Sequence, residues 1–563
     1  MTDSIQLVEL QSITVSAETH SPTTAMQNLS AQVELEDVAS PRSRLRLWMI
    51  VIALNAVLFI SALDQTIVAT TIPAITADLQ SAAGYTWIGG AYLLASAVSG
   101  PIWTKTSDIW GRKPILLVSV LTFAAASLIA ALSIDINMLI AARGLQGTAA
   151  GGLAQLVAIS TSDIFSLRER ALFFGLQGGV YAVAGSAGPL IGGALAQYVS
   201  WRWCFWINLP ICGLAFILLL LLLDTHNPRT PLTVGLKAID WHGTITMLAM
   251  SLLFLLGLNF GGSIFPWNSA TVISLIVLGT AGIGVFLYVE SAVARYPLMP
   301  LSVFKHVSNN MVVLLAVGHS MINTGVEFYL PLYFQSVKQK SPLMSGLLLL
   351  PLMVVAAVTD ILTGIAIHKT GRYIDLLRTG AVLMTIGTGL YISLESDTPI
   401  AHIIGFEVVS GTGVALLYQA PMLAIHNFVK QPDVAAATAS LGFLRTIASA
   451  VSIVVGGVLF QNGMNEQQMN LQTAGLDQTA LHAFSGDHAA ASFDAVALIT
   501  DIAQLKVILS AYAWSIRNIF ILYACIGGLT MIASLFVKQG HMSEVHVETK
   551  TGIAHMTPRD NKE

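Results

Sequence analysis

The chain consists largely of apolar runs of about 20 residues, each separated from the next by a short polar loop. Runs of this length are typical of helices that cross a membrane, and we predict about fourteen of them. The predicted spans cover residues 47–72, 84–104, 114–134, 137–161, 171–195, 202–223, 242–261, 269–290, 311–334, 344–367, 374–394, 400–426, 436–460 and 514–537.

The composition excludes a soluble globular protein. Of the 563 residues, 55% are hydrophobic and only 10% are charged, whereas soluble domains carry roughly 25% charged residues. The net charge of -4 comes from dispersed residues, so we expect no nucleic-acid partner. The three cysteines show no paired spacing, and we therefore predict no disulfide framework, no metal site and no cofactor.

The basic residues predict the orientation. Most of the 27 lysines and arginines lie in loops that share one side when both termini are cytoplasmic, as the positive-inside rule requires. Residues 1–45 are polar and are predicted to form a disordered cytoplasmic tail. The glycosylation sequon at Asn28 should therefore stay unmodified. Residues 538–563 form a second predicted cytoplasmic tail.

A weak internal repeat suggests two halves. The pattern G-x4-K-T occurs at Gly100–Thr106 and again at Gly364–Thr370, after the second and tenth predicted spans. Two parallel six-helix halves joined by an inserted helix pair would explain it. The predicted parts are an N-terminal half at 46–223, a linker with the inserted pair at 224–305, and a C-terminal half at 306–537. Within the last part, 461–512 is predicted to be extracellular, with a helix near 496–509 lying on the bilayer or on the bundle.

The loop GPIWTKTSDIWGRK at Gly100–Lys113 is typical of membrane carriers. Asp108 can pair with Arg112 beside the turn at Gly111, and Lys113 adds a further positive charge. We predict that Asp108, Arg112 and Lys113 close the cytoplasmic side by holding spans two and three against the other half, at the eleventh span. The alternative is an ordinary positive-inside loop.

Further motifs carry a family resemblance. They are LDQTIVATTIP (63–73), RGLQGTAAGG (143–152), GSAGPLIGG (185–193) and WRWCFWINLP (201–210), together with the loop above. Over about residues 45–540 the chain resembles the fungal fourteen-span branch of the drug:proton antiporter-2 family, in the major facilitator superfamily. The resemblance implies an all-α integral membrane fold, about 14 transmembrane helices in two six-helix halves plus an inserted pair, and a multidrug or toxin efflux pump. Thr104 and Thr106 depart from the family's loop motif.

Charged residues inside predicted spans are functional candidates, because each costs on the order of 2.5–3.5 kcal/mol to insert. Asp64 and Arg143 lie at similar depths and are expected to form an ion pair that protonation of Asp64 would loosen. A permanent structural salt bridge is the alternative. The resemblance favours the first interpretation, since the family's RxxQG motif, here Arg143 to Gly147, is linked to proton transfer.

Three further carboxylates, Glu327, Asp360 and Glu407, have no assured basic partner at their depth. An unpaired buried carboxylate suits a group that binds and releases a proton. We expect Asp360 to be foremost among them for proton coupling, although each of the three could instead line water within a cavity.

The fifth span contains a glycine motif formed by Gly185, Gly188, Pro189, Gly192 and Gly193. Glycines at this spacing let a neighbouring helix approach closely, and Pro189 permits a bend. Such packing would either be purely structural or seal the route against proton leak. Candidate substrate contacts in the central cavity are Gln146, Tyr181, Tyr418 and Gln419.

Several chemistries are excluded by motif. There is no GxxxxGK[ST] phosphate loop and no GxSxG, HExxH or CxxC pattern, so we expect neither an ATP-driven pump nor an enzyme. The expected function is proton-coupled export of apolar or amphipathic small molecules by alternating access, from a monomer in the plasma membrane or the vacuolar membrane. A siderophore or nutrient carrier and a non-transporting receptor are the alternatives, and a channel is disfavoured because no selectivity loop is present.

Overall fold

A computed structural model describes residues 44–68, 70–79, 84–262, 264–489, 496, 499–546 and 549–556. The chain divides into two units, Met1–Trp48 and Met49–Glu563, and every contact discussed below lies within the second. The predicted N-terminal tail up to residue 43 and its Asn28 sequon lie outside the described residues.

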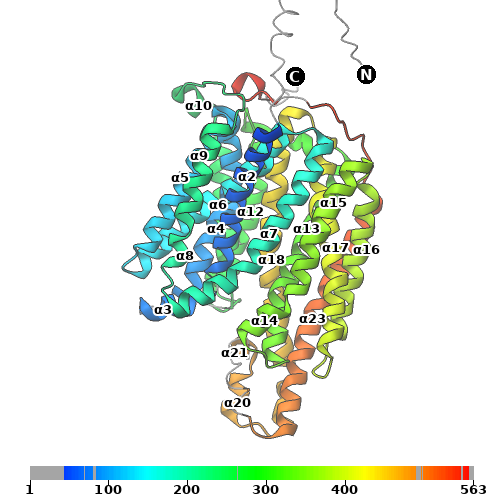
Figure 1. The fold of residues 1–563 in the computed structure, drawn as a ribbon. Helices are drawn as coiled ribbons and strands as arrows, with labels where there is room; N and C mark the ends of the chain where they lie inside the picture. The colour runs from blue at the N-terminus through cyan, green and yellow to red at the C-terminus, as the bar shows by residue number, and fades with distance from the viewer. Residues whose placement is uncertain are drawn as a thin grey trace, which may run out of the picture. The chain divides into compact units, whose positions relative to one another are not determined.

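Long helices dominate the described residues (Figure 1). They are α2 (Arg44–Ile67), α4 (Gly84–Trp110), α5 (Arg112–Ala131), α6 (Ile136–Ile164), α7 (Leu167–Tyr198), α9 (Asn208–Leu222), α11 (Trp241–Phe260), α12 (Ala270–Tyr288), α13 (Val307–Ser336), α15 (Leu350–Thr370), α16 (Ile374–Leu390), α17 (Ile400–Asn427), α18 (Val434–Glu466) and α23 (Ile502–Leu535). Shorter helices between them include α3 (Ile72–Asp78), α8 (Trp203–Trp206), α10 (Leu232–Ala238) and α14 (Pro342–Leu348).

Twelve of the described helical segments are long and apolar enough to cross a membrane. Helices α4 and α6 are long enough, with 27 and 29 residues, but are less apolar because they carry the polar loop and RGLQG motifs. With these two helices included, every predicted span corresponds to a long helix. The fold is therefore an all-α membrane bundle, as the sequence predicts.

The helix contacts define two groups of helices, which also touch each other. In the first group, α4 and α5 pack on α6, and α5 packs on α9. In the second group, α13 packs on α18 and α23, while α17 packs on α15 and α16. The two groups meet where α7 packs on α15 and α17, and where α18 packs on α4 and α6. Helices α11 and α12, which the sequence predicts to be an inserted pair, pack on each other, and α11 also contacts α4 and α18.

The contact between α7 and α15 is made by small residues. A Cβ on Gly175 would lie 2.6 Å from the Asp360 carbonyl oxygen, and a Cβ on Gly364 would lie 2.6 Å from the Ala171 carbonyl oxygen. Larger side chains at these two positions would prevent so close an approach. Small residues between membrane helices usually serve to let two backbones come this near.

Two long helices extend into the segment 461–512, which is predicted to be extracellular. Helix α18 continues to Glu466, and α23 already begins at Ile502, where the Asp501 side chain accepts a hydrogen bond from the Ala503 N–H. Residues 502–509 are thus the first turns of a helix of 34 residues, about 51 Å long, and not a separate helix on the bilayer. The sequence window missed this because these turns project beyond a hydrocarbon core of about 30 Å.

Candidate functional site

A buried polar network surrounds Asp64 in α2. The Asp64 side chain is fully buried, and its Oδ2 accepts a hydrogen bond of 2.6 Å from Arg143 of α6. Its Oδ1 accepts a second one, of 2.7 Å, from the Gln146 amide, one turn further along α6. The expected Asp64–Arg143 ion pair is therefore present, and Gln146 is part of it.

The Arg143 guanidinium is held on several sides. It donates to the Gln146 side-chain oxygen at 2.7 Å and to the Ile88 carbonyl of α4 at 3.2 Å. It also lies 4.2 Å from the centroid of the Tyr92 ring, and the Tyr92 hydroxyl donates to the Ser61 carbonyl of α2. A guanidinium over an aromatic face is attracted to the ring, and here the contact fixes the cation against α4.

Two members of this network were not predicted. Asn208, the first residue of α9, donates to Asp64 Oδ1 at 2.8 Å and to the Ser127 hydroxyl at 3.1 Å. Gln146 also donates to Ser127, at 2.9 Å. Asn208 and Ser127 are each a polar residue inside an apolar run, and this pattern in the sequence could have identified them. Five helices, α2, α4, α5, α6 and α9, thus contribute polar groups to one network, and the carboxylate itself accepts bonds from α6 and α9.

A second group of polar residues lies between α7 and α13. Tyr181 of α7 is 40% exposed and donates from its hydroxyl to the Gln65 side chain at 3.1 Å. Glu327 of α13 is also exposed and lies within electrostatic range of Tyr181. Its Oε1 accepts a hydrogen bond from the Asn323 amide at 3.0 Å. Gln65, next to Asp64 in sequence, links this group to the buried network.

Asp360 lies at the contact between α7 and α15 and is only 5% exposed. A Cβ on Gly178 would come within 2.7 Å of Asp360 Oδ2, so the carboxyl group faces the glycines of α7. Asp360 Oδ1 has no hydrogen-bond partner within the described ranges. Arg445 of α18 is within electrostatic range, but no ion pair forms between the two residues.

Arg445 is used differently from Arg143. It donates to the Tyr418 carbonyl of α17 at 2.8 Å, and its charge lies 5.5 Å from the Tyr418 ring centroid. Tyr418 is in turn within electrostatic range of Asp360 and Glu327. Of the predicted cavity residues, Tyr181 and Tyr418 therefore lie together with two of the predicted carboxylates.

Glu407 lies apart from that group, in the contact between α16 and α17. It is fully buried, and neither carboxyl oxygen has a hydrogen-bond partner among the described residues. The hydroxyl groups of Tyr391 and Ser410 are buried close to one another in the same contact. An unpaired carboxylate is expensive in such a place, whereas a protonated one is neutral.

Two predicted cavity contacts are buried instead. Gln146 is fully buried in the Asp64 network. Gln419 of α17 is 6% exposed and donates across the helix groups to the Phe174 carbonyl of α7 at 2.8 Å. Both amides use hydrogen bonds on protein groups, as buried amides do, and the sequence alone does not indicate these partners.

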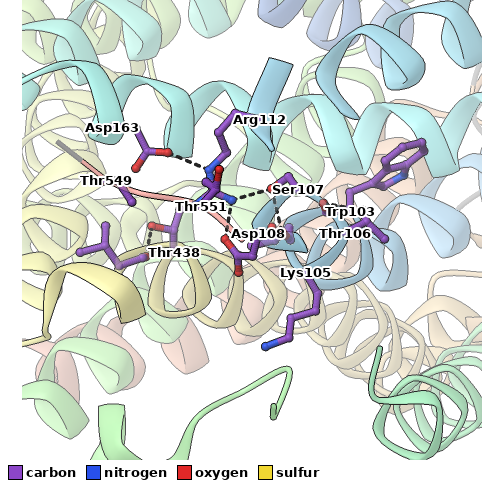
Figure 2. Close-up of polar contacts among 12 residues, drawn as sticks. Trp103, Lys105, Thr106, Ser107, Asp108, Arg112, Asp163, Thr438, Thr549 and Thr551 are labelled. Carbon is purple, nitrogen blue, oxygen red and sulfur yellow. Dashed lines mark hydrogen bonds and ion pairs between the residues drawn. The ribbon is translucent and has the colours of Figure 1, made fainter. Parts of the chain in front are cut away.

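The Asp108–Arg112 pair of the basic loop is present, but it acts within one helix group. Arg112 is 2% exposed and donates to Asp108 at 2.5 Å, to Ser107 at 2.6 Å and to Asp163 of α6 at 2.7 Å (Figure 2). These bonds join the ends of α4, α5 and α6. Asp163 is a partner that the sequence did not reveal, because it lies more than fifty residues from Arg112.

The predicted contact of this loop with the eleventh span is wrong. The helix of the other group that packs on α4 is α18, the thirteenth span, and not α16. Lys113 is half-buried and has no ion-pair partner within the described ranges. Lys105, by contrast, is buried and donates to the Pro297 carbonyl at 3.1 Å, which ties α4 to the segment after α12.

The glycine motif of α7 divides into two kinds of position. A Cβ on Gly188 would collide with Thr66, and one on Gly192 would collide with the Ile67 carbonyl and Thr70, all near the end of α2. Gly185 and Gly193 have open space beside them, so close packing holds for Gly188 and Gly192 only. Helix α7 continues through Pro189 to Tyr198.

An apolar groove of about 530 Å³ lies beside α8 and α9, away from these charged groups. It is lined by Leu195, Trp203, Trp206, Ile207, Leu209 and Pro210. The groove contains no ionisable side chain, so it supplies no chemistry to the site.

Comparison with known proteins decides the family. The model of the Major Facilitator Superfamily matches residues 54–453. The chain belongs to the major facilitator superfamily. It is 41% identical over 516 residues to the MFS-type transporter ppz2 of Metarhizium majus, covering 92% of this chain and 89% of the relative. It is 41% identical over 505 residues to the efflux pump dotC of Dothistroma septosporum, covering 90% and 86%.

Solved structures of the superfamily share the fold at low identity. The human organic anion transporter MFSD10 aligns with a TM-score of 0.54 at 14% identity, covering 85% of this chain and 99% of that one. The proton:xylose symporter XylE aligns with a TM-score of 0.53 at 13% identity, covering 92% and 99%. As a member of the major facilitator superfamily, the chain is a multi-pass membrane transporter and not an enzyme.

Proposed function

We propose that this transporter exports apolar or amphipathic small molecules, such as drugs or fungal secondary metabolites, in exchange for protons. The observation that carries the proposal is the Asp64 network, in which one fully buried carboxylate is held by Arg143, Gln146 and Asn208. Protonation of Asp64 removes the charge that organises these donors, so a proton arriving there changes how α2, α6 and α9 hold together.

Asp360 is the second proposed proton carrier. It lies at the contact between α7 and α15, which joins the two helix groups, and one of its oxygens is free of hydrogen bonds within the described ranges. A bare carboxylate there is an uncompensated buried charge that opposes close packing, whereas the protonated group does not. Glu327 and Glu407 are further candidates, the first at the exposed polar group and the second inside the α16–α17 contact.

Transport is proposed to proceed by alternating access between the halves 46–223 and 306–537. The basic loops place one end of the bundle in the cytoplasm, and the network of Asp108, Arg112 and Asp163 stabilises the first half at that end. The contacts of α4 with α18 and of α7 with α15 would separate when this side opens.

The substrate class follows from the residues between α7 and α13. Tyr181 and Tyr418 offer aromatic surface, and Glu327 adds an acceptor that is open to a ligand. Such a site suits neutral or weakly cationic apolar compounds better than polyanions. Export as the direction is supported by the relatives named efflux pumps. We place the protein in the plasma membrane as a monomer, with the vacuolar membrane as the alternative.

The proposal is tested with the purified protein in liposomes loaded with rhodamine 6G, a weakly cationic apolar dye. An imposed pH gradient should drive dye movement opposite to the proton flow, and collapsing the gradient with an ionophore should stop it. Movement of dye and protons in the same direction would instead support the carrier for nutrient or siderophore uptake. Dye movement that is independent of the pH gradient would contradict proton coupling.

A further inference from the structure

The C-terminal segment after α23 lies against the basic end of the helix bundle. Its first residues bind the second half, where the Tyr373 hydroxyl donates to the Lys538 carbonyl at 2.8 Å and accepts from the Gly540 N–H at 2.9 Å. Met542, two residues after Gly540, is 5% exposed. The segment is therefore packed onto the protein from its start.

The segment then reaches the first half. The Ser543 carbonyl accepts a hydrogen bond of 3.3 Å from the Arg168 N–H at the start of α7, and Glu544 forms an ion pair with Arg168. The same arginine donates to the carbonyls of His368 and Lys369 at the end of α15, each at 2.6 Å. Arg168 thus connects the segment to both sides of the α7–α15 contact.

Further along, the segment binds both halves again. The Thr549 hydroxyl accepts from the Gln431 amide at 2.7 Å, between α17 and α18. The Thr551 N–H donates to His226 Nδ1 at 3.1 Å, and the Thr551 hydroxyl donates to the His226 carbonyl at 3.0 Å. The Gly552 N–H donates to the Asp108 carbonyl at 2.7 Å, directly beside the Arg112 network (Figure 2).

The backbone conformation and the packing of the segment around Gly552 favour the residues that are present there. Gly552 has φ +111°, a conformation that favours glycine, and a Cβ there would lie 2.7 Å from Pro228. Thr551 is 5% exposed, and the His555 ring lies 6.0 Å from the His226 ring. These residues fill a defined place between the end of α4 and the segment after α9.

We propose that the described residues 543–546 and 549–555 act as a strap that holds the cytoplasmic side closed. Because it binds Gln431 of the second half and Asp108 of the first half, those ends cannot separate while both bonds persist. The strap must detach from one half before the cytoplasmic side can open. Its detachment therefore limits how often the cytoplasmic side opens. The inference rests on the proposed alternating access, but its test needs neither a substrate nor a proton gradient.

The test measures how fast a buried cysteine reacts with a membrane-impermeant maleimide from the cytoplasmic side. Ser440→Cys places the reporter near the start of α18, where Ser440 is 2% exposed. The exposed native Cys525 is replaced by serine. Deletion of residues 546–563 should raise the labelling rate about tenfold, since the hydrogen bonds of Thr549, Thr551 and Gly552 are lost. Deletion of residues 557–563, which leaves the strap intact, should change nothing.

Two further variants keep the strap falsifiable if the long deletion perturbs folding. Thr551→Val should raise labelling about threefold by removing a hydroxyl bond, whereas Thr473→Val at the exposed end of the short helix α19 (Gln468–Thr473) should leave it unchanged. A peptide of residues 543–556 added to the deleted protein should restore slow labelling. Wild-type labelling rates in both the deletion and Thr551→Val overturn the strap, as does a peptide that fails to restore protection. Faster labelling without gradient-driven dye transport would leave the strap in place and reject the proposed function.

Discussion

Asn208 and Gln146 donate to the same oxygen of Asp64, at 2.8 and 2.7 Å, although they come from helices α9 and α6. The shared acceptor means that the carboxylate holds two helices in addition to its own. Loss of its charge weakens both bonds together, because hydrogen bonds to a charged group are stronger than bonds to a neutral one.

Asn208→Leu should reduce both stability and transport. The variant removes a buried bond to a charged group, which contributes about 1.5–3 kcal/mol, and leaves the Ser127 hydroxyl with one donor fewer. Thermal unfolding in detergent measures the loss, with Asn470→Leu at an exposed position of α19 as the control. Equal melting temperatures for the two variants would show that Asn208 does not support the network.

Asp163→Ala should destabilise the basic end by about 1.5–3 kcal/mol, because it removes one charged hydrogen bond of the buried Arg112, which keeps Asp108 as its second carboxylate partner. The control is Asp375→Ala, whose pair with Arg372 is largely exposed and is worth up to about 1 kcal/mol. Unfolding measurements on both variants check this. Similar losses would mean that burial of the Arg112 pair has no consequence.

The glycine motif offers matched substitutions on one helix. Gly188→Ala and Gly192→Ala should each cost about 1–3 kcal/mol, because the new methyl groups collide with the end of α2. Gly185→Ala and Gly193→Ala should be neutral or slightly stabilising, since open space surrounds both positions. Unfolding midpoints of the four variants test the difference, and a uniform response would contradict the packing that the structure shows.

Glu327→Gln should alter selectivity more than folding. Removing the exposed negative charge should lower the transport of rhodamine 6G relative to the neutral dye Nile red by roughly two- to fivefold, since an exposed ion pair contributes up to about 1 kcal/mol. Glu466→Gln, at the end of α18, provides the control. An unchanged ratio of the two dyes would remove Glu327 from the substrate site.

The helices were largely predictable, since each long apolar run is dictated by the thickness of the bilayer. The similar depths of Asp64 and Arg143 in the membrane also followed from counting residues along their predicted spans. Asp163, Asn208 and the strap did not, because their partners are distant in sequence and are selected by helix packing. The protein partners of Gln146 and Gln419 were not predictable for the same reason.

The central claim is that protonation of Asp64 couples proton flow to export. The most direct measurement is proton flux and rhodamine 6G flux in the same liposomes, compared between Asp64→Asn and the surface variant Asp375→Asn. We predict that Asp64→Asn binds dye and stays folded but loses gradient-driven transport, while Asp375→Asn behaves as the wild type. Unchanged coupled fluxes in Asp64→Asn would contradict the account.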